Sequence, residues 1–266
     1  MKTKRSVRKA RPIAPPRMKS RRKAREVTTK FHRLTHELER LKGQQPLNVE
    51  QQHARKERIE AIHKQLQDMG GQQAYQDASI LSTRFHKTSK WIFQLLTSFG
   101  LRPKAKEPPL RVLEVGAINT QLVSCPWLDV RAIDLNSRHP RIEQCDFFSL
   151  EPTGEFQIVV SSMVLNCVPG AEKRGAMLRL YRQHLKEGGL LFLMLPLLCL
   201  RHSQFMTYAR FLTIFEAIGF QVRQTKNSPK VAFFCFERTE AVNPTASFPL
   251  KRLVPGSKPN DFSVVI

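Results

Sequence analysis

Several common features are scarce in this 266-residue sequence, and each absence narrows the possible functions. The five cysteines form no C-x-x-C pair, which argues against a disulfide framework or a zinc site and favours reduced thiols inside a cell. The longest apolar run, residues 190–200, is too short to cross a bilayer and is interrupted by Pro196. No apolar stretch follows the early positive charges, so we expect no secretory signal. We therefore expect an intracellular protein with no metal site and no membrane partner.

Acidic residues are almost missing from the N-terminus. Residues 1–30 contain 13 Lys or Arg and one acid, Glu26, for a net charge of +12, whereas the last 200 residues carry +8 of the total of +22. Such a block cannot bury a core, so we expect a disordered basic arm over residues 1–27. A solubilising tail is one interpretation and a polyanion-binding arm is the other. The arm lacks bulky apolar residues, which favours nucleic acid over a membrane surface, and the basic run 17–23 is typical of a nuclear or nucleolar address.

Two helices are expected between the arm and the main domain. The first has an apolar stripe at helical spacing and stops at Gly43, and the second begins at a capping residue, Asn48, and ends at Gly70 and Gly71. We interpret residues 28–72 as a helical hairpin, basic on its outside, that either packs on the main domain or binds RNA.

Strands and helices alternate in the rest of the chain, which predicts a doubly wound α/β domain over residues 73–240. We expect helices at 88–99, 171–186 and 205–218, and strands at 110–115, 129–134, 142–147, 156–163 and 190–195. The neighbouring strands 220–224 and 231–237 predict an antiparallel hairpin at the edge of a mostly parallel sheet. Residues 241–266 are expected to form a loose tail.

Glycine is also scarce where a nucleotide-binding turn would need it. The stretch RVLEVGAIN (111–119) has one glycine after its strand, whereas a dinucleotide fingerprint has three, and Pro126 leaves room for little helix behind it. A phosphate-free nucleoside such as S-adenosylmethionine fits this turn better. Gly116 allows close approach of a ligand, Asp134 can bind ribose hydroxyls, and Asp146 with Phe147 offers a carboxylate and a ring to the adenine.

Each of these signals has an ordinary structural explanation when it is taken alone. A single glycine after a strand is usually a turn, and an Asp at a strand end is often a cap. The combination after three successive strands is more specific, because the carboxyl ends of such strands form one edge of the sheet. Glu114 and Ser161, also at strand ends, complete the set of candidate cofactor-binding residues.

At these positions the chain resembles a known family, the fungal enzymes that methylate adenine N1 in 25S rRNA. The similar segments cover roughly residues 70–240 and comprise YQDAS (75–79), RVLEVGAIN, AIDLNS, CDFF, SSMVLNCVPGAEKRGAML and LLFLMLPLLCL. The resemblance implies a Rossmann-like class I methyltransferase with S-adenosylmethionine as donor, large-subunit rRNA of the pre-ribosome as acceptor, and a nucleolar location in the nucleus. The family's donor-binding glycine and acid fall on Gly116 and Asp134.

The implied reaction asks little of the protein's own side chains. Adenine N1 carries an in-plane lone pair that is unprotonated at neutral pH, so no general base is required, and catalysis should come from positioning. The base must be unpaired or flipped out, because N1 lies on its Watson–Crick edge. Asn166 is our candidate for holding the base, although it is also placed to cap the next helix. Ser162, Pro196 and Arg201 are weaker candidates for the donor pocket, the base pocket and a phosphate contact.

Two other functions remain open from the sequence. One is a non-catalytic S-adenosylmethionine sensor that acts through protein partners, as in animal relatives of this fold. The other is an assembly factor that holds rRNA and uses the cofactor fold as a scaffold. The basic arm favours an RNA partner over the sensor, and donor binding would argue against the scaffold.

Overall fold

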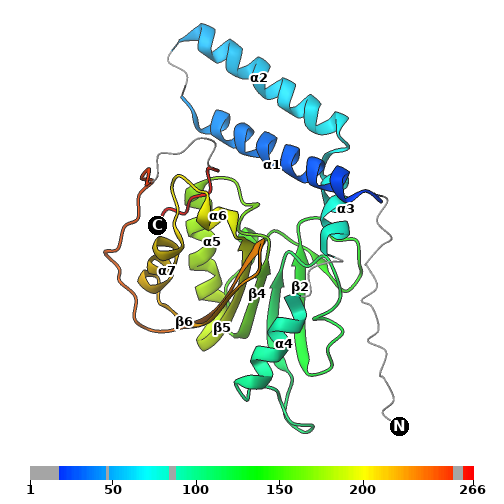
Figure 1. Cartoon of the computed structure of the whole chain (residues 1–266), viewed down its shortest axis with the longest axis vertical. Helices are drawn as coiled ribbons and strands as arrows, with labels where there is room; N and C mark the ends of the chain where they lie inside the picture. The colour runs from blue at the N-terminus through cyan, green and yellow to red at the C-terminus, as the bar shows by residue number, and fades with distance from the viewer. Residues whose placement is uncertain (1–17, 46–47, 84–87, 254–259) are drawn as a thin grey trace.

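The computed structural model describes residues 18–45, 48–83, 88–253 and 260–266 (Figure 1). The first 17 residues of the predicted arm lie outside these ranges. The helices are α1 (Arg21–Gly43), α2 (Val49–Asp68), α3 (Gly71–Thr83), α4 (Thr88–Ser98), the 3-10 turn η1 (Phe147–Ser149), α5 (Ala171–His184), α6 (Leu198–Arg201) and α7 (Tyr208–Ala217). The strands are β1 (Leu110–Val115), β2 (Leu128–Asp134), β3 (Glu143–Gln144), β4 (Phe156–Ser162), β5 (Leu185–Pro196), β6 (Phe220–Asn227) and β7 (Val231–Arg238).

A seven-stranded sheet forms the centre of the molecule, in the order β3-β2-β1-β4-β5-β7-β6. Neighbours from β3 to β5 are parallel, and β7 is antiparallel to both β5 and β6. The predicted mostly parallel sheet with an antiparallel edge is confirmed. The chain builds outward from β1 to β3 and then crosses to β4, so the strand order reverses between β1 and β4. Ligands of such sheets bind at the carboxyl ends of the strands beside this point.

Strand β5 is buried on both faces, as its apolar sequence predicts. Alternate side chains of Leu191–Leu195 join a core cluster with α5 and α7, and those of Leu190–Met194 join a second cluster with Trp91 of α4. In the first cluster Phe215 of α7 stacks on Phe236 of β7, with ring centroids 4.0 Å apart. The sheet is therefore fixed between two helical layers, and only its strand ends are available for a site.

Two elements of the main domain differ from the sequence prediction. The third strand is limited to Glu143–Gln144, because the Asp146 side chain accepts a hydrogen bond from the Phe148 N–H (3.0 Å) and caps η1. Strand β5 begins at Leu185, directly after α5, so Gly188 and Gly189 lie within the strand and do not end the helix. Leu185 is fully buried and pairs with Phe156 of β4, and this burial draws the segment into the sheet.

The N-terminal helices pack on the main domain, which is one of the two roles that the sequence left open for the hairpin. Helix α1 begins at Arg21, inside the expected arm, where the Ser20 hydroxyl caps it by accepting from the Lys23 N–H (3.3 Å). Helix α3, which we did not predict, packs against α1 through a cluster of Ala24 with Ala78 and Leu81. The expected boundary between residues 72 and 73 therefore falls inside α3.

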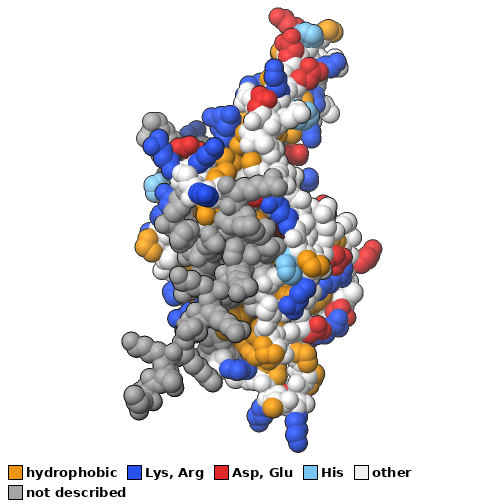
Figure 2. Space-filling view, turned by 90° about the vertical axis from the view of Figure 1, so that its right-hand side faces the viewer, with side chains coloured by type: hydrophobic (Ala, Val, Ile, Leu, Met, Phe, Trp, Pro, Cys, Tyr) orange, Lys and Arg blue, Asp and Glu red, His pale blue; other side chains and the backbone are white. Residues whose placement is uncertain are grey.

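The surface of the α1–α2 hairpin carries charges of both signs (Figure 2). Glu37 of α1 pairs with Arg58 of α2 (2.7 Å), and Arg22 pairs with Glu26 (3.0 Å). The hairpin is predominantly basic only in its first part, since residues 21–33 contain six Lys or Arg and one acid. Within the described ranges no helix combines the length and apolar character needed to cross a membrane.

The C-terminal residues 260–266 pack against the main domain, which corrects the expectation of a loose tail for this part. Phe262 and Val264 are buried. The Arg174 guanidinium of α5 donates to the Ser263 carbonyl (2.9 Å) and lies over the Phe262 ring (5.0 Å). The tail approaches α5 so closely that a Cβ built on Gly175 would lie 1.8 Å from the Val265 carbonyl oxygen.

We expect Gly175→Ala to destabilise the protein by about 1–3 kcal/mol, because the added methyl must displace the tail. The cost of displacing the tail therefore outweighs the roughly 1 kcal/mol by which Ala is favoured over Gly in a helix. Gly43→Ala is the matched control, since nothing lies within 4 Å of its Cβ position. Urea unfolding of both variants measures the difference. Equal stabilities would show that the tail does not depend on this contact.

Candidate active site

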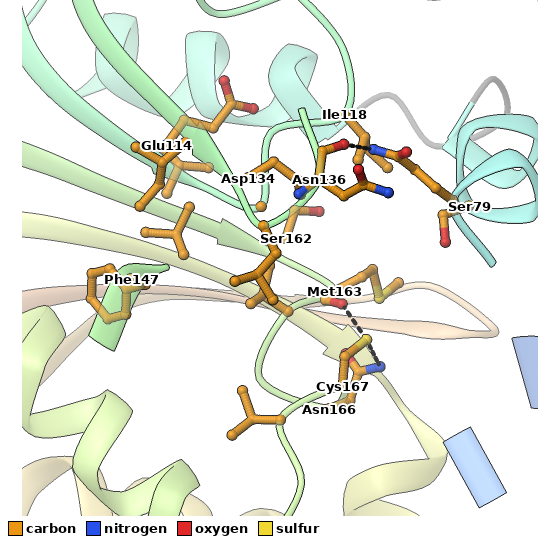
Figure 3. Close-up of a pocket in the computed structure, with 18 of the residues that line it drawn as sticks. Ser79, Glu114, Ile118, Asp134, Asn136, Phe147, Ser162, Met163, Asn166 and Cys167 are labelled. Carbon is orange, nitrogen blue, oxygen red and sulfur yellow. Dashed lines mark hydrogen bonds between the residues drawn. The ribbon is translucent and has the colours of Figure 1, made fainter. Parts of the chain in front are cut away.

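A cavity of about 600 Å³ lies at the carboxyl ends of β1, β2 and β4 (Figure 3). Residues of α1, α3 and α4 form its remaining walls. The structure brings most of the predicted site residues together here, although they come from different strands and loops. Those that line the cavity are Glu114, Gly116, Asp134, Asp146, Phe147 and Asn166. Ser162 and Pro196 also line it, whereas Ser161 and Arg201 do not.

Gly116 is required by the geometry of the turn after β1. Its φ of 72° lies in the left-handed region, which side chains other than glycine rarely adopt. A Cβ at this position would also lie 2.3 Å from Cγ2 of Val164, in the loop after β4. The glycine thus lets the loop after β1 and the loop after β4 meet at the floor of the cavity.

Two of the three acidic residues are fixed by hydrogen bonds to nearby backbone. Asp134 accepts from the Asn136 N–H (2.9 Å) at the end of β2, and burial raises the pKa of its carboxyl. Asp146 caps η1 through one of its oxygens. In each case the hydrogen bond to one oxygen orients the carboxylate. Within the described residues the second oxygen receives no hydrogen bond.

The stacking role predicted for Phe147 is not supported. Its ring is 3% exposed and packs on Tyr181 and His184, with centroids 5.2 Å away in each case. It therefore belongs to the core beneath the cavity. The apolar side chains that remain accessible at this end are Leu135, which is 59% exposed, and Phe148, which is 37% exposed; both line the cavity.

Glu114 is the most unusual group in the cavity. It is buried at the end of β1, and its Oε2 has no hydrogen-bond partner among the described residues. Burial raises the pKa of its carboxyl to about 8. A buried carboxyl without a partner is costly, so it is suited to a ligand that brings a hydrogen-bond donor or a positive charge.

Ser161 was predicted as a cofactor residue, and the structure corrects this. Side chains alternate along β4, so Ser161 faces the core and shares a hydrogen bond with the Tyr181 hydroxyl (2.7 Å). Val160 and Ser162 face the other way and line the cavity. The error is one of register, because two adjacent serines at a strand end cannot be distinguished by spacing.

Asn166 lies in the loop between β4 and α5, next to Cys167 (Figure 3). It does not cap α5: the capping position is Gly170, and no side chain bonds there. Its Nδ2 donates to the Cys167 sulfur (3.3 Å), while its Oδ1 is buried without a partner in the described part of the chain. The amide is therefore held with a free acceptor. The preceding Met163 has a φ of 62°, a strained value for a residue with a side chain.

The Cys167 thiol joins this loop to the N-terminal helices. It donates to the Met163 carbonyl (3.0 Å), and the Tyr75 hydroxyl of α3 hydrogen-bonds to its sulfur (3.1 Å). His32 Nε2 of α1 lies 3.8 Å from the same sulfur. Burial raises the pKa of the thiol to about 11, so it is protonated at neutral pH and serves as a structural junction.

Helices α1 and α3 form a wall of the cavity. Packing of the predicted α1 helix on the main domain was one of the two roles left open by the sequence, whereas α3 was not predicted. Tyr75 stacks on Phe31, with centroids 4.5 Å apart, and meets His32 edge-on. Gln76 donates to the Asn136 carbonyl, and Asp77 pairs with Arg138 beyond β2 (2.7 Å). These contacts fix α3 over the end of β2.

The histidine in this wall is neutral. Burial, with the neighbouring His36 and Arg174, lowers the pKa of His32 to about 4. Helix α1 was predicted from its apolar stripe, whereas the signal for α3 was the segment YQDAS, which was part of the family resemblance but carried no assigned role. Among the described residues no group of three His, Cys, Asp or Glu is arranged to hold a metal ion.

The sheet order and the cavity define a methyltransferase fold of the S-adenosylmethionine-dependent type. A solved structure with this fold is the 1,6-didemethyltoxoflavin-N1-methyltransferase of Burkholderia thailandensis, which contains bound 1,6-didemethyltoxoflavin and S-adenosylhomocysteine. The TM-score is 0.51 and the identity 14%, over 74% of this chain and 93% of that one. At this identity the similarity supports the fold alone.

Sequence comparison then identifies the family. The family model described as "25S rRNA (adenine(2142)-N(1))-methyltransferase, Bmt2" matches residues 60–264, so the chain belongs to the Bmt2 family. It is 31% identical over 195 residues to the 25S rRNA adenine-N(1) methyltransferase of Schizosaccharomyces pombe, covering 68% of this chain and 71% of the relative. It is 29% identical over 218 residues to the 25S rRNA (adenine(2142)-N(1))-methyltransferase of Saccharomyces cerevisiae, covering 77% of this chain and 63% of that protein.

The burial of Glu114 predicts a pH dependence of stability in the ligand-free protein. In the unfolded chain the carboxyl loses its proton near 4.5, whereas in the folded protein it keeps the proton to about 8. The free energy of unfolding should therefore fall as the pH rises from about 4.5 through 8. Glu114→Gln should remove this component, so that the variant gains stability relative to wild type with rising pH. Denaturant titrations across this window test it, and parallel profiles for the two proteins would contradict it.

Proposed function

We propose that this protein transfers the methyl group of S-adenosylmethionine to N1 of an adenine in 25S rRNA. The observation that carries the proposal is that strand-end residues within the range matched by the Bmt2 family model, residues 60–264, line one cavity at the sheet edge where this fold binds ligands. S-adenosylmethionine, when bound, supplies an electrophilic methyl group on a sulfonium. The remaining task of the protein is to hold two reactants in position.

The donor end of the cavity is formed by the loops after β1, β2 and β3. Asp134 would accept hydrogen bonds from the ribose hydroxyls, and Asp146 from the exocyclic amine of the adenine. Glu114 would pair with the α-amino group, which gives a partner to its buried oxygen. The carboxylates of Asp134 and Asp146 are also favourable for a ligand that carries a sulfonium and an ammonium.

The acceptor end lies beside the loop after β4. The free Oδ1 of Asn166 would accept from the exocyclic amine of the target adenine, which is adjacent to N1. No group in this part of the cavity needs to remove a proton, because N1 attacks with its lone pair. The neutral state of His32 fits this chemistry, since a charged imidazole would repel a cationic donor and a cationic product.

The same proposal extends to ribosome biogenesis, with the pre-ribosome as partner and the nucleolus as location. It is supported by the basic run 17–23 and by the charge of +12 in the first 30 residues. The test of location is a tagged full-length protein compared with a variant in which the lysines and arginines of residues 17–23 are replaced by glutamine. Loss of nucleolar accumulation in the variant is expected, and an unchanged distribution would contradict it.

Asp134→Ala should weaken the binding of S-adenosylhomocysteine by about 1.5–3 kcal/mol, or roughly 10- to 100-fold, because it removes charge-assisted hydrogen bonds to the ribose. Gly116→Arg should abolish binding, because even a Cβ at that position meets Val164. Asp129→Ala, in the same strand but exposed, is the matched control and should bind normally. Isothermal titration calorimetry on folded proteins measures all three. Wild-type affinity in both site variants would show that the donor site is elsewhere.

The reaction itself is tested by mass spectrometry of nucleosides from 25S rRNA incubated with the protein and S-adenosylmethionine. We expect 1-methyladenosine. Asn166→Ala should lower kcat/KM about 10-fold or more, the equivalent of one hydrogen bond to the base, without changing donor affinity. Asn166→Asp keeps an acceptor oxygen and should retain more activity. Donor binding without any 1-methyladenosine would reject the proposed reaction and leave the sensor as the alternative.

A further inference from the structure

The charges around the cavity are divided between its interior and its rim. The interior carries three carboxyls, Glu114, Asp134 and Asp146. Among the described residues that line the cavity, Lys173 is the single Lys or Arg. Its side chain is exposed, and within the described ranges the ammonium group forms no ion pair and no hydrogen bond. A cation in this position has no structural partner to explain it.

The cavity wall between the loop after β4 and the start of α5 shows where Lys173 lies. This wall includes Cys167, Val168, Pro169 and Lys173. Cys167 Sγ lies 3.8 Å from Nε2 of His32 in α1. Lys173 is exposed and lines the cavity, so it lies at the rim on this side.

The opposite side of this rim also carries a cation. Thr29 of α1 is exposed and lines the cavity. Arg33 lies one helical turn from Thr29, on the same side of α1. It is exposed and forms no ion pair within the described part of the chain. The cavity thus opens between cations on two helices, next to the acceptor end that contains Asn166.

We propose that this rim, formed by Lys173 and Arg33, is the entrance for the RNA strand and that Lys173 contacts a backbone phosphate at or next to the target nucleotide. The inference rests on the proposed function and adds the path of the substrate to it. Phosphate contacts fix the register of a nucleic acid on a protein without reading its bases. A phosphate at the rim holds the base edge toward Asn166, while the acidic interior disfavours the backbone and favours the cationic donor.

The proposal is tested by the salt dependence of RNA binding. Binding of 25S rRNA and of a short oligoadenylate is measured between about 0.05 and 0.3 M salt for wild type, Lys173→Ala and a double variant that adds Arg33→Ala. Loss of one contact to single-stranded RNA should reduce the slope of log K against log salt by about 0.7, and should weaken binding about fivefold near 0.1 M salt. The double variant should lose about twice that slope.

Two matched variants serve as controls. Lys173→Arg keeps the charge and should keep the slope. Lys226→Ala removes an exposed lysine from β6, at the far edge of the sheet, and should change nothing. Affinity for S-adenosylhomocysteine should be the same in all variants, which also shows that they are folded.

The possible results separate this inference from the proposed function. An unchanged slope in Lys173→Ala, with methylation by wild type intact, overturns the entrance and leaves the methyltransferase. Weaker binding of S-adenosylhomocysteine by Lys173→Ala assigns the lysine to the donor carboxylate and likewise overturns it. A reduced slope in a protein that forms no 1-methyladenosine supports the entrance and rejects the reaction.

Discussion

The contact between the turn after β1 and the loop after β4 is the constraint on which the site depends. Val164 occupies the space that a Cβ at Gly116 would need, so these two loops close on each other at the point where the strand order reverses. The same loop carries Asn166 and Cys167. A change in its path would therefore move the Asn166 amide, the floor of the cavity and the anchor of the N-terminal helices together.

Burial keeps the ionisable groups around this loop neutral. It raises the pKa of Cys167 and Tyr75 and lowers that of His32, whereas Glu114, whose pKa lies near 8, belongs to the donor end of the cavity. In an enzyme that removed a proton from its substrate, we would expect one group tuned to accept it near neutral pH. A reaction at the lone pair of adenine N1 has no such requirement. The cavity instead offers fixed hydrogen-bond acceptors, which suits catalysis by positioning.

The N-terminal helices belong to the site and are not an appendage. Helix α1 reaches the cavity through Thr28, Thr29 and His32, and α3 reaches it through Tyr75 and Gln76. The packing of Ala24 against Ala78 and Leu81 holds the two helices together as one wall. This arrangement places the most basic described part of α1 beside the loop that contains Asn166 and Cys167.

The sequence by itself determined the sheet and the residues at its strand ends. An apolar run, a glycine and an acid at successive strand ends were sufficient to predict Gly116, Asp134 and Asp146, because parallel strands bring their carboxyl ends to one edge. Tertiary structure alone decided the rest. Ser161 faces the core because of strand register, and the Phe147 ring is drawn inward by Tyr181 and His184. Helix α3 and the C-terminal residues gain their positions from partners far along the chain, Cys167 and Arg174, and no local pattern records contacts of that kind.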